Sequence, residues 1–128
     1  MCGLLGIIAA NGAAENFVEA VEGALPCMHH RGPDDSGTWH DQDVVFGFNR
    51  LSIIDLEHSH QPLQWGPEGE ENRYALTFNG EIYNYVELRE ELKEAGYTFN
   101  TEGDGETIVV GFHHWGADVV NHLSLIHI

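Results

Sequence analysis

The stretch VVFGFNRLSII, residues 44–54, decides the fold class. Its β-branched and aromatic residues predict a strand. The turn-forming Asp-Gln-Asp at 41–43 precedes it and follows a short strand-like segment at 38–40, so the sequence predicts a hairpin. Strands joined by so short a turn pair antiparallel, which favours an α+β fold over a doubly wound parallel sheet.

Further strands are predicted on both sides of this hairpin. Residues 3–10 form an apolar run that predicts a strand buried on both faces, and residues 74–78 predict another. Residues 99–100 are a candidate for a further short strand. HRGPDDSG, residues 30–37, and residues 55–69 are rich in turn formers and are predicted as loops.

Helices are predicted between the strands. Apolar positions recur at helical spacing from Phe17, and Pro26 and Gly32 limit that helix. A second helix is predicted at 85–96, where Asn84 and the glutamate three positions later resemble a capping box. GDGETIVVGFHHWG predicts a loop that leads into a third helix. No repeat or linker is present, so we place no boundary within the chain.

The charge balance excludes several classes of partner. The chain has 128 residues, 42% of them hydrophobic, and carries 21 acidic against 5 basic side chains, for a formal net charge of −16. Nucleic acids and anionic membrane surfaces select clustered lysine and arginine, so neither is an expected partner. No transmembrane stretch or signal-peptide pattern is present, and we expect a reducing, cytoplasmic location.

The few cations differ in their surroundings. Arg89 and Lys93 lie four positions apart among glutamates, which predicts solvated salt-bridge partners. Arg73, at a strand entrance, is predicted to be structural. Arg50 instead interrupts an apolar strand, where a guanidinium needs a carboxylate partner. That carboxylate is either an internal side chain or part of a substrate that a bidentate clamp holds.

Two short motifs carry polar groups at the ends of elements. Asn79–Gly80 places a side-chain amide beside an accessible backbone N–H, and the pair is either a tight turn or an oxyanion hole. Asp104 lies between two glycines ahead of a helix. Its carboxylate either caps that helix or holds a substrate ammonium group.

The two cysteines and nine histidines complete the candidate reactive groups. The histidine pairs lack metal-ligand spacing, so no metal site is predicted. Cys27 has helical neighbours and is predicted to be a buried core thiol. Cys2 directly follows the initiator methionine. Either that position has no special meaning, or removal of Met1 leaves Cys2 with a thiol and a free α-amine on one carbon.

Five stretches in this order carry a resemblance to a known family: MCGLLGI, HRGPDDSG, NRLSIID, NGEIYNY and GDGETI. Together they closely resemble the class II glutamine amidotransferase domain of glutamine-hydrolysing asparagine synthetases, over roughly residues 1–122. The resemblance implies a four-layer αββα fold of the N-terminal nucleophile hydrolase type. It also implies hydrolysis of the side-chain amide of L-glutamine to glutamate and ammonia.

The resemblance also implies a role for each matching residue. Cys2 is the expected nucleophile, and its own α-amine is the expected base, because such an amine titrates at about 7.7–8. Arg50 is expected to bind the α-carboxylate of glutamine, with backbone groups around Leu51 and Ile53. The remaining expected site residues are the oxyanion-hole pair Asn79 and Gly80 and, for the α-ammonium group, Glu81 and Asp104. Residues 30–37 are expected near the glutamine site without a catalytic role.

The implied partners follow from the same resemblance. L-glutamine is the expected substrate, and the glutaminase chemistry is expected to need no cofactor. ATP and magnesium are expected only in a C-terminal synthetase domain, absent here, that makes asparagine from aspartate. Three alternatives stay open: another class II amidotransferase, a non-catalytic fragment that binds glutamine or docks a partner, and, ranked last, a metal-binding protein that uses the histidines.

The end of the chain departs from the family pattern. Residues 123–128 form a divergent tail where the family continues with further strands. Missing strands would leave a sheet edge and apolar surface uncovered. We therefore expect an incomplete domain over 1–122 whose isolated fold is marginal.

Overall fold

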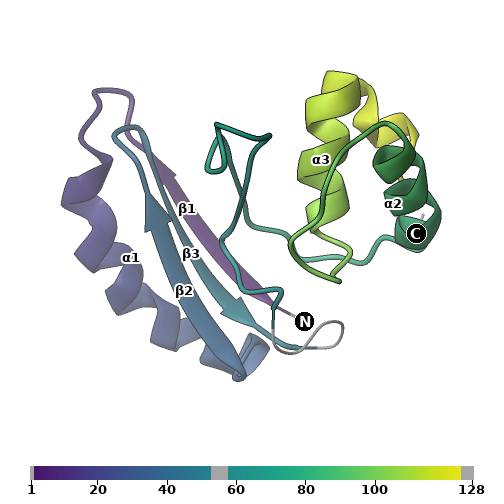
Figure 1. The fold of residues 1–128 in the computed structure, drawn as a ribbon. Helices are drawn as coiled ribbons and strands as arrows, with labels where there is room; N and C mark the ends of the chain where they lie inside the picture. The colour runs from purple at the N-terminus through teal and green to yellow at the C-terminus, as the bar shows by residue number, and fades with distance from the viewer. Residues whose placement is uncertain (1, 53–57, 125–128) are drawn as a thin grey trace. The chain divides into compact units, whose positions relative to one another are not determined.

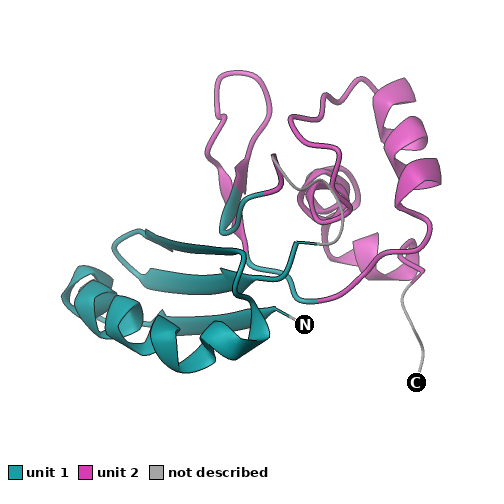
Figure 2. Cartoon of the chain, turned by 90° about the horizontal axis from the view of Figure 1, so that it is seen from below, with its two compact units in different colours: residues 1–53, 60–63, 77–79 teal, residues 54–59, 64–76, 80–128 magenta. Residues whose placement is uncertain are grey.

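The computed structural model describes residues 2–52 and 58–124 of the chain, which divides into two compact units (Figures 1 and 2). The first unit comprises residues 1–53, 60–63 and 77–79, and the second comprises residues 54–59, 64–76 and 80–128. The sequence predicts no boundary within the chain. It could not show this division, because two short segments return to the first unit and no linker composition marks the crossing points.

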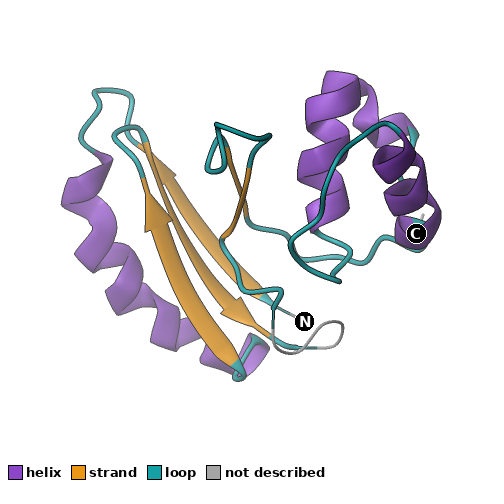
Figure 3. Ribbon diagram, viewed as in Figure 1, coloured by secondary structure: helices purple, strands orange, loops and turns teal. Residues whose placement is uncertain are grey.

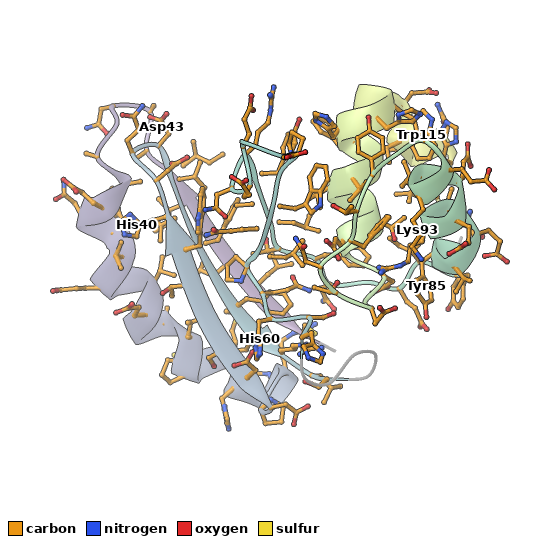
Figure 4. The ribbon with its side chains drawn as sticks, in the orientation of Figure 1. His40, Asp43, His60, Tyr85, Lys93 and Trp115 are labelled. Atoms are coloured by element: carbon orange, nitrogen blue, oxygen red, sulfur yellow. The ribbon has the colours of Figure 1, made fainter. Side chains whose placement is uncertain are left out.

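A three-stranded antiparallel sheet forms the centre of the first unit (Figure 3). Its order is β1 (Gly3–Ile8), β3 (Val44–Arg50) and β2 (Asp35–His40). The carboxylate of Asp41 accepts hydrogen bonds from the N–H groups of Asp43 and Val44, both at 2.8 Å, and closes the turn between β2 and β3. His40 and Asp43, on either side of Asp41, are labelled in Figure 4. The predicted hairpin is confirmed. β2 begins three residues earlier than expected, within HRGPDDSG, and β3 ends at Arg50 rather than at residue 54.

Helical segments cover one face of this sheet. They are η1 (Ala14–Phe17), α1 (Val18–Ala24) and η2 (Leu25–Arg31), so the helix predicted from Phe17 tightens into 3-10 turns at both ends. Gly47 in the middle of β3 permits the close approach, because a Cβ there would lie 2.6 Å from Cγ1 of Val21. Side chains alternate along a strand, so Val45, Gly47 and Asn49 share the helix-covered face.

The opposite face of the sheet is only partly covered. Leu4 is 47% exposed and Ile8 80% exposed. The prediction that the first strand is buried on both faces is therefore wrong. It rested on a run without alternation, and such a run does not distinguish a covered from an uncovered face. Phe48, on the same face, is fully buried, and Phe46 stacks on Trp39 with ring centroids 5.8 Å apart.

The second unit contains two helices, a two-stranded sheet and a 3-10 turn. These are β4 (Leu63–Trp65, of which Leu63 belongs to the first unit), β5 (Tyr74–Leu76), α2 (Tyr85–Glu94), α3 (Glu106–Trp115) and η3 (Gly116–Asn121). The second and third predicted helices and the strand at residue 74 are confirmed. β4 lies inside the segment predicted as a loop, and residues 99–100 form no strand.

Aromatic side chains pack around Trp65 in this unit. Trp65 is 2% exposed, its indole N–H donates to the carbonyl of Thr98 at 3.2 Å, and its ring contacts those of Tyr74, Tyr97 and His113. Trp115, at the end of α3, stacks on His122 (Trp115 is labelled in Figure 4). Several histidines thus serve as ring-packing groups.

Two local predictions are wrong for reasons of tertiary structure. Asn84 does not cap α2 with its side chain. Its amide instead donates to the carbonyl of His122 at 2.9 Å and accepts from the N–H of Ser124 at 2.8 Å. Cys27 is exposed rather than buried.

No helix in the described part of the chain is long and apolar enough to cross a membrane.

Candidate active site

The thiol of Cys2 lies against the main chain of Leu51. The N–H of Leu51 is 3.3 Å from the sulfur, and the thiol is 3.7 Å from the carbonyl oxygen of the same residue. The β1–β3 register explains this contact, because Gly3 pairs with Asn49 and so carries Cys2 to the end of β3. The two backbone groups orient a half-buried thiol at a strand end.

Arg31 holds the main chain of Cys2, whereas Leu51 contacts its thiol. Its Nε donates to the carbonyl of Cys2 at 3.0 Å. Arg31 ends η2, and Gly3 packs against that element, since a Cβ at Gly3 would lie 3.1 Å from Cβ of Met28. Arg31 is a residue that sequence reasoning missed. The signal that could have found it is the rarity of cations, because Arg31 is one of only 5 in the chain.

The loop after Arg31 braces the end of β3. The N–H of Asp34 donates to the carbonyl of Arg50 at 3.0 Å, and its carboxylate accepts from the N–H of Ser52 at 2.7 Å. Gly32 passes so close that a Cβ would lie 2.3 Å from the carbonyl oxygen of Asn49. HRGPDDSG therefore packs against the end of β3, where Leu51 contacts Cys2.

Asn49 and Arg50 are both buried at this strand end. Asn49 is 1% exposed, and its amide donates to the carbonyl of Leu25 at 2.7 Å while accepting from the hydroxyl of Ser36 at 2.9 Å. Arg50 is 5% exposed and pairs in register with Asp35. Strand alternation puts the Arg50 side chain on the sheet face opposite the helices. Ile53, the neighbouring predicted site residue, lies outside the described residues.

Asn79 follows a backbone segment that Gln61 holds. The side-chain amide of Gln61 donates to the carbonyl of Phe78 at 3.2 Å and accepts from its N–H at 2.6 Å. Both hydrogen-bonding groups of one peptide residue are thereby paired with a single side chain. Asn79 is exposed, as is Gly80, which belongs to the second unit. Gln61 is a second residue that sequence reasoning missed.

Asp104 lies beside the backbone that follows Glu81. Its carboxylate accepts from the N–H of Ile82 at 3.0 Å. Asp104 does not cap α3 with its side chain, since the cap position is Gly105 and no side-chain cap bond is present there. Glu81 is exposed and Asp104 half-buried. Of the two alternatives for Asp104, the helix cap is thus wrong, and the ammonium-binding role stays a prediction.

Comparison with known proteins decides the family. Residues 1–127 match the family described as the glutamine amidotransferase domain. The chain belongs to this family. Cys2, Arg50 and Asn79 therefore lie in the first unit of a glutamine amidotransferase domain, and Gly80, Glu81 and Asp104 lie in the second.

Curated relatives of this glutamine amidotransferase domain are much longer proteins. A Mycobacterium tuberculosis protein named as a glutamine-hydrolysing asparagine synthetase is 55% identical over 96% of this chain and 21% of its own length. Glutamine-hydrolysing asparagine synthetase 1 of Bacillus subtilis is 43% identical over 96% of this chain and 19% of its own length. The Arabidopsis thaliana protein of that name is 34% identical over 97% of this chain and 20% of its own length. The chain thus spans about a fifth of the length of these relatives.

The titratable groups of the described residues do not gather into a metal centre. Within residues 2–52 and 58–124, no group of three or more His, Cys, Asp or Glu side chains is placed to hold a metal ion. His60 pairs with Asp35 at 2.6 Å across the first unit (His60 is labelled in Figure 4). In the second unit, His113, His114 and His122 contact aromatic rings.

Proposed function

We propose that this chain hydrolyses the side-chain amide of L-glutamine to glutamate and ammonia, with Cys2 as the nucleophile. The observation that carries the proposal is the position of Cys2, whose thiol the main chain of Leu51 orients at 3.3 Å in a domain of the glutamine amidotransferase family. Removal of Met1 frees the α-amine of Cys2 to act as the base, since at least about half of such amines are neutral near pH 8.

The reaction proceeds in two steps, formation of a thioester on Cys2 and its hydrolysis. The α-amine takes the thiol proton, the sulfur attacks the amide carbon of glutamine, and the proton passes to the leaving nitrogen as ammonia departs. A γ-glutamyl thioester remains on Cys2. Water gives a proton to the same amine and attacks the thioester carbon. The carbon–sulfur bond then breaks, glutamate leaves, and the amine returns the proton to the sulfur of Cys2. Asn79 and Gly80 stabilise the oxyanion of both tetrahedral intermediates.

The substrate's own charges explain the remaining assignments. Glutamine is a zwitterion, and Arg50 is proposed to bind its α-carboxylate with backbone groups of Leu51 and Ile53. Asp104 and Glu81 are proposed to bind its α-ammonium group. The position of Arg50 supports this role, because it ends β3 directly before Leu51, whose N–H contacts the sulfur of Cys2, and a guanidinium can bind a carboxylate through two parallel hydrogen bonds.

The names and lengths of the relatives support a wider role. We propose that the ammonia serves ATP-dependent asparagine synthesis from aspartate in a further C-terminal domain. ATP and magnesium belong to that domain, and glutamine hydrolysis by residues 1–128 requires no cofactor. A reducing, cytoplasmic compartment suits a mechanism that depends on a free thiol.

The proposed fold is the four-layer αββα arrangement of N-terminal nucleophile hydrolases. The β1–β3–β2 sheet is one of these layers, and the helical segments on one of its faces are a second. The apolar side chains of Leu4 and Ile8 on the other face, 47% and 80% exposed, support a second sheet as the neighbouring layer.

The test is glutamate release from glutamine by the wild type, Cys2→Ala and Cys27→Ala, with the intact mass of each protein measured. We expect the wild type to lack Met1 and to release glutamate, Cys2→Ala to be inactive, and Cys27→Ala, at an exposed thiol, to match the wild type. Equal rates for wild type and Cys2→Ala, or activity with Met1 attached, would contradict the proposal.

A further inference from the structure

Two buried charges hold the loop that carries Asp104. Glu106 opens α3 and is 1% exposed, and Arg89 lies on α2 and is 5% exposed. The sequence predicts Arg89 as a solvated partner of neighbouring glutamates. That prediction is wrong, because α2 turns this residue inward, whereas Lys93 does pair with Glu90 at the surface, at 2.8 Å.

Glu106 binds the N–H side of the loop. Its Oε1 accepts from the N–H of Asn100 at 2.7 Å. Its Oε2 accepts from the N–H of Thr101 at 2.8 Å and from the hydroxyl of the same residue at 2.7 Å. A buried carboxylate is costly unless it is hydrogen-bonded, and these three donors satisfy it.

Arg89 binds the carbonyl side of the same loop. Its guanidinium donates to the carbonyl of Gly103 at 3.0 Å and to the carbonyl of Thr101. It also stacks over the ring of Phe99, 4.2 Å from the centroid, and lies 3.8 Å from the exposed carboxylate of Glu102. Thr101 is therefore held at both ends, its N–H by an anion and its carbonyl by a cation.

The loop so fixed leads directly to Asp104. Only Gly103, whose carbonyl Arg89 binds, lies between Asp104 and the exposed Glu102. The Asp104 carboxylate in turn accepts from the N–H of Ile82 at 3.0 Å. Without the two charges, the loop would lose the hydrogen bonds that they make to Asn100, Thr101 and Gly103, and we expect Asp104 to sample more positions.

We infer that Arg89 and Glu106 are positioning residues that hold the 99–103 loop from opposite sides and so place the Asp104 carboxylate for the α-ammonium group of glutamine. The inference rests on the proposed function for its substrate. Neither residue is assigned a contact with glutamine. They act on selectivity for the ammonium group, rather than on the sulfur chemistry at Cys2.

The test compares two substrates. One is glutamine, and the other is 4-carbamoylbutanoate, which is glutamine without its α-amino group. The variants are Glu106→Gln, Arg89→Met and Arg89→Lys, with Asp104→Asn as the reference. The matched controls are Glu91→Gln and Lys93→Met, both at exposed positions of α2.

We expect the ratio of kcat/KM for glutamine over 4-carbamoylbutanoate to fall about tenfold or more in Glu106→Gln, Arg89→Met and Asp104→Asn. Most of the fall in kcat/KM for glutamine will come from a higher KM. Arg89→Lys will restore part of the ratio, and the two controls will match the wild type. A general folding defect would lower kcat/KM for both substrates by the same factor and leave the ratio unchanged.

Amide hydrogen exchange gives a second readout that needs no turnover. We expect the N–H groups of Asn100, Thr101 and Ile82 to exchange at least about tenfold faster in Glu106→Gln than in the wild type or Glu91→Gln. Unchanged exchange at Ile82 would overturn the inference. So would an unchanged substrate ratio in Glu106→Gln alongside a lowered ratio in Asp104→Asn.

Failure of the proposed function has a different signature. A wild type that releases no glutamate, or an Asp104→Asn variant with an unchanged ratio, contradicts the assigned chemistry or the role of Asp104. Faster exchange at Ile82 in Glu106→Gln would still confirm that the two charges hold the loop.

Discussion

The main-chain N–H of Leu51 lies 3.3 Å from the sulfur of Cys2, a contact between residues 49 positions apart in the sequence. Antiparallel pairing of β1 with β3 creates this contact, and Arg31 adds a hydrogen bond of 3.0 Å to the carbonyl of Cys2. Cys2, the proposed nucleophile, is thus held at its thiol by the main chain of Leu51 and at its carbonyl by the side chain of Arg31.

Arg31→Met is expected to lower kcat for glutamine hydrolysis about tenfold with little change in KM. The side chain keeps its apolar stem and loses the donor to the Cys2 carbonyl, and a hydrogen bond from a charged group is worth about 1.5–3 kcal/mol. Steady-state kinetics and the rate of Cys2 alkylation by iodoacetamide measure the effect. A KM increase at constant kcat would instead indicate that Arg31 contacts the substrate.

Gly32→Ala is expected to destabilise the chain by about 3 kcal/mol or more, because its Cβ would lie 2.3 Å from the carbonyl oxygen of Asn49. The matched control is Gly23→Ala in α1, where a Cβ meets nothing within 4 Å. That change is expected to stabilise by about 0.5–1 kcal/mol. Urea unfolding of both variants provides the comparison, and equal midpoints would contradict the close approach.

Gln61→Leu is expected to cost about 1–3 kcal/mol of stability, because it removes both partners of the Phe78 main chain. If Asn79 is an oxyanion donor, kcat will fall more than KM rises. The reason is that an oxyanion donor stabilises the transition state more than bound glutamine, so its displacement affects mainly kcat. Gln64→Leu, at an exposed position of β4, is the control and is expected to leave kcat unchanged. A Gln61→Leu enzyme with wild-type kcat would remove Gln61 from this role.

Lys93→Met is expected to raise the pKa of Glu90. The hydrogen bond and charge of Lys93 hold the pKa of that carboxyl below its usual value. A lowered folded-state pKa contributes stability above the unfolded-state pKa, and this is lost as pH falls through the folded-state value. The pair is exposed, so we expect the titration of Glu90 to move while the unfolding midpoint at pH 7 stays almost constant. NMR titration of the Glu90 side chain is the measurement.

Local sequence patterns predicted most of the elements. The hairpin turn at Asp41 depends on a short-range side-chain hydrogen bond, and α2 and α3 depend on periodicity, all of which the sequence displays directly. β4 was missed because three residues between two proline-containing loops carry no pattern of their own, and their pairing with β5 supplies the order. The predicted end of β3 was also wrong, because the apolar residues after Arg50 continue the strand pattern although the strand ends there.

The candidate site was predictable only where motifs are contiguous. The contact of Cys2 with Leu51 needs the β1–β3 register, which no single motif contains. Arg89 was misplaced because its sequence neighbours are acidic, while its real partners are the carbonyls of Thr101 and Gly103. Glu106 escaped notice because two of its three donors are main-chain N–H groups, which no sequence motif marks.

The supports at the end of β3 use main-chain atoms of residues 51 and 52, through the Leu51 N–H and carbonyl and the Ser52 N–H. Mutational tolerance at these two positions is therefore a consequence of the architecture. A saturation library at 51 and 52 is expected to retain thiol reactivity with most side chains other than proline, which lacks the N–H. Directed evolution of substrate preference could begin at these two codons without disturbing the main-chain contacts of Cys2.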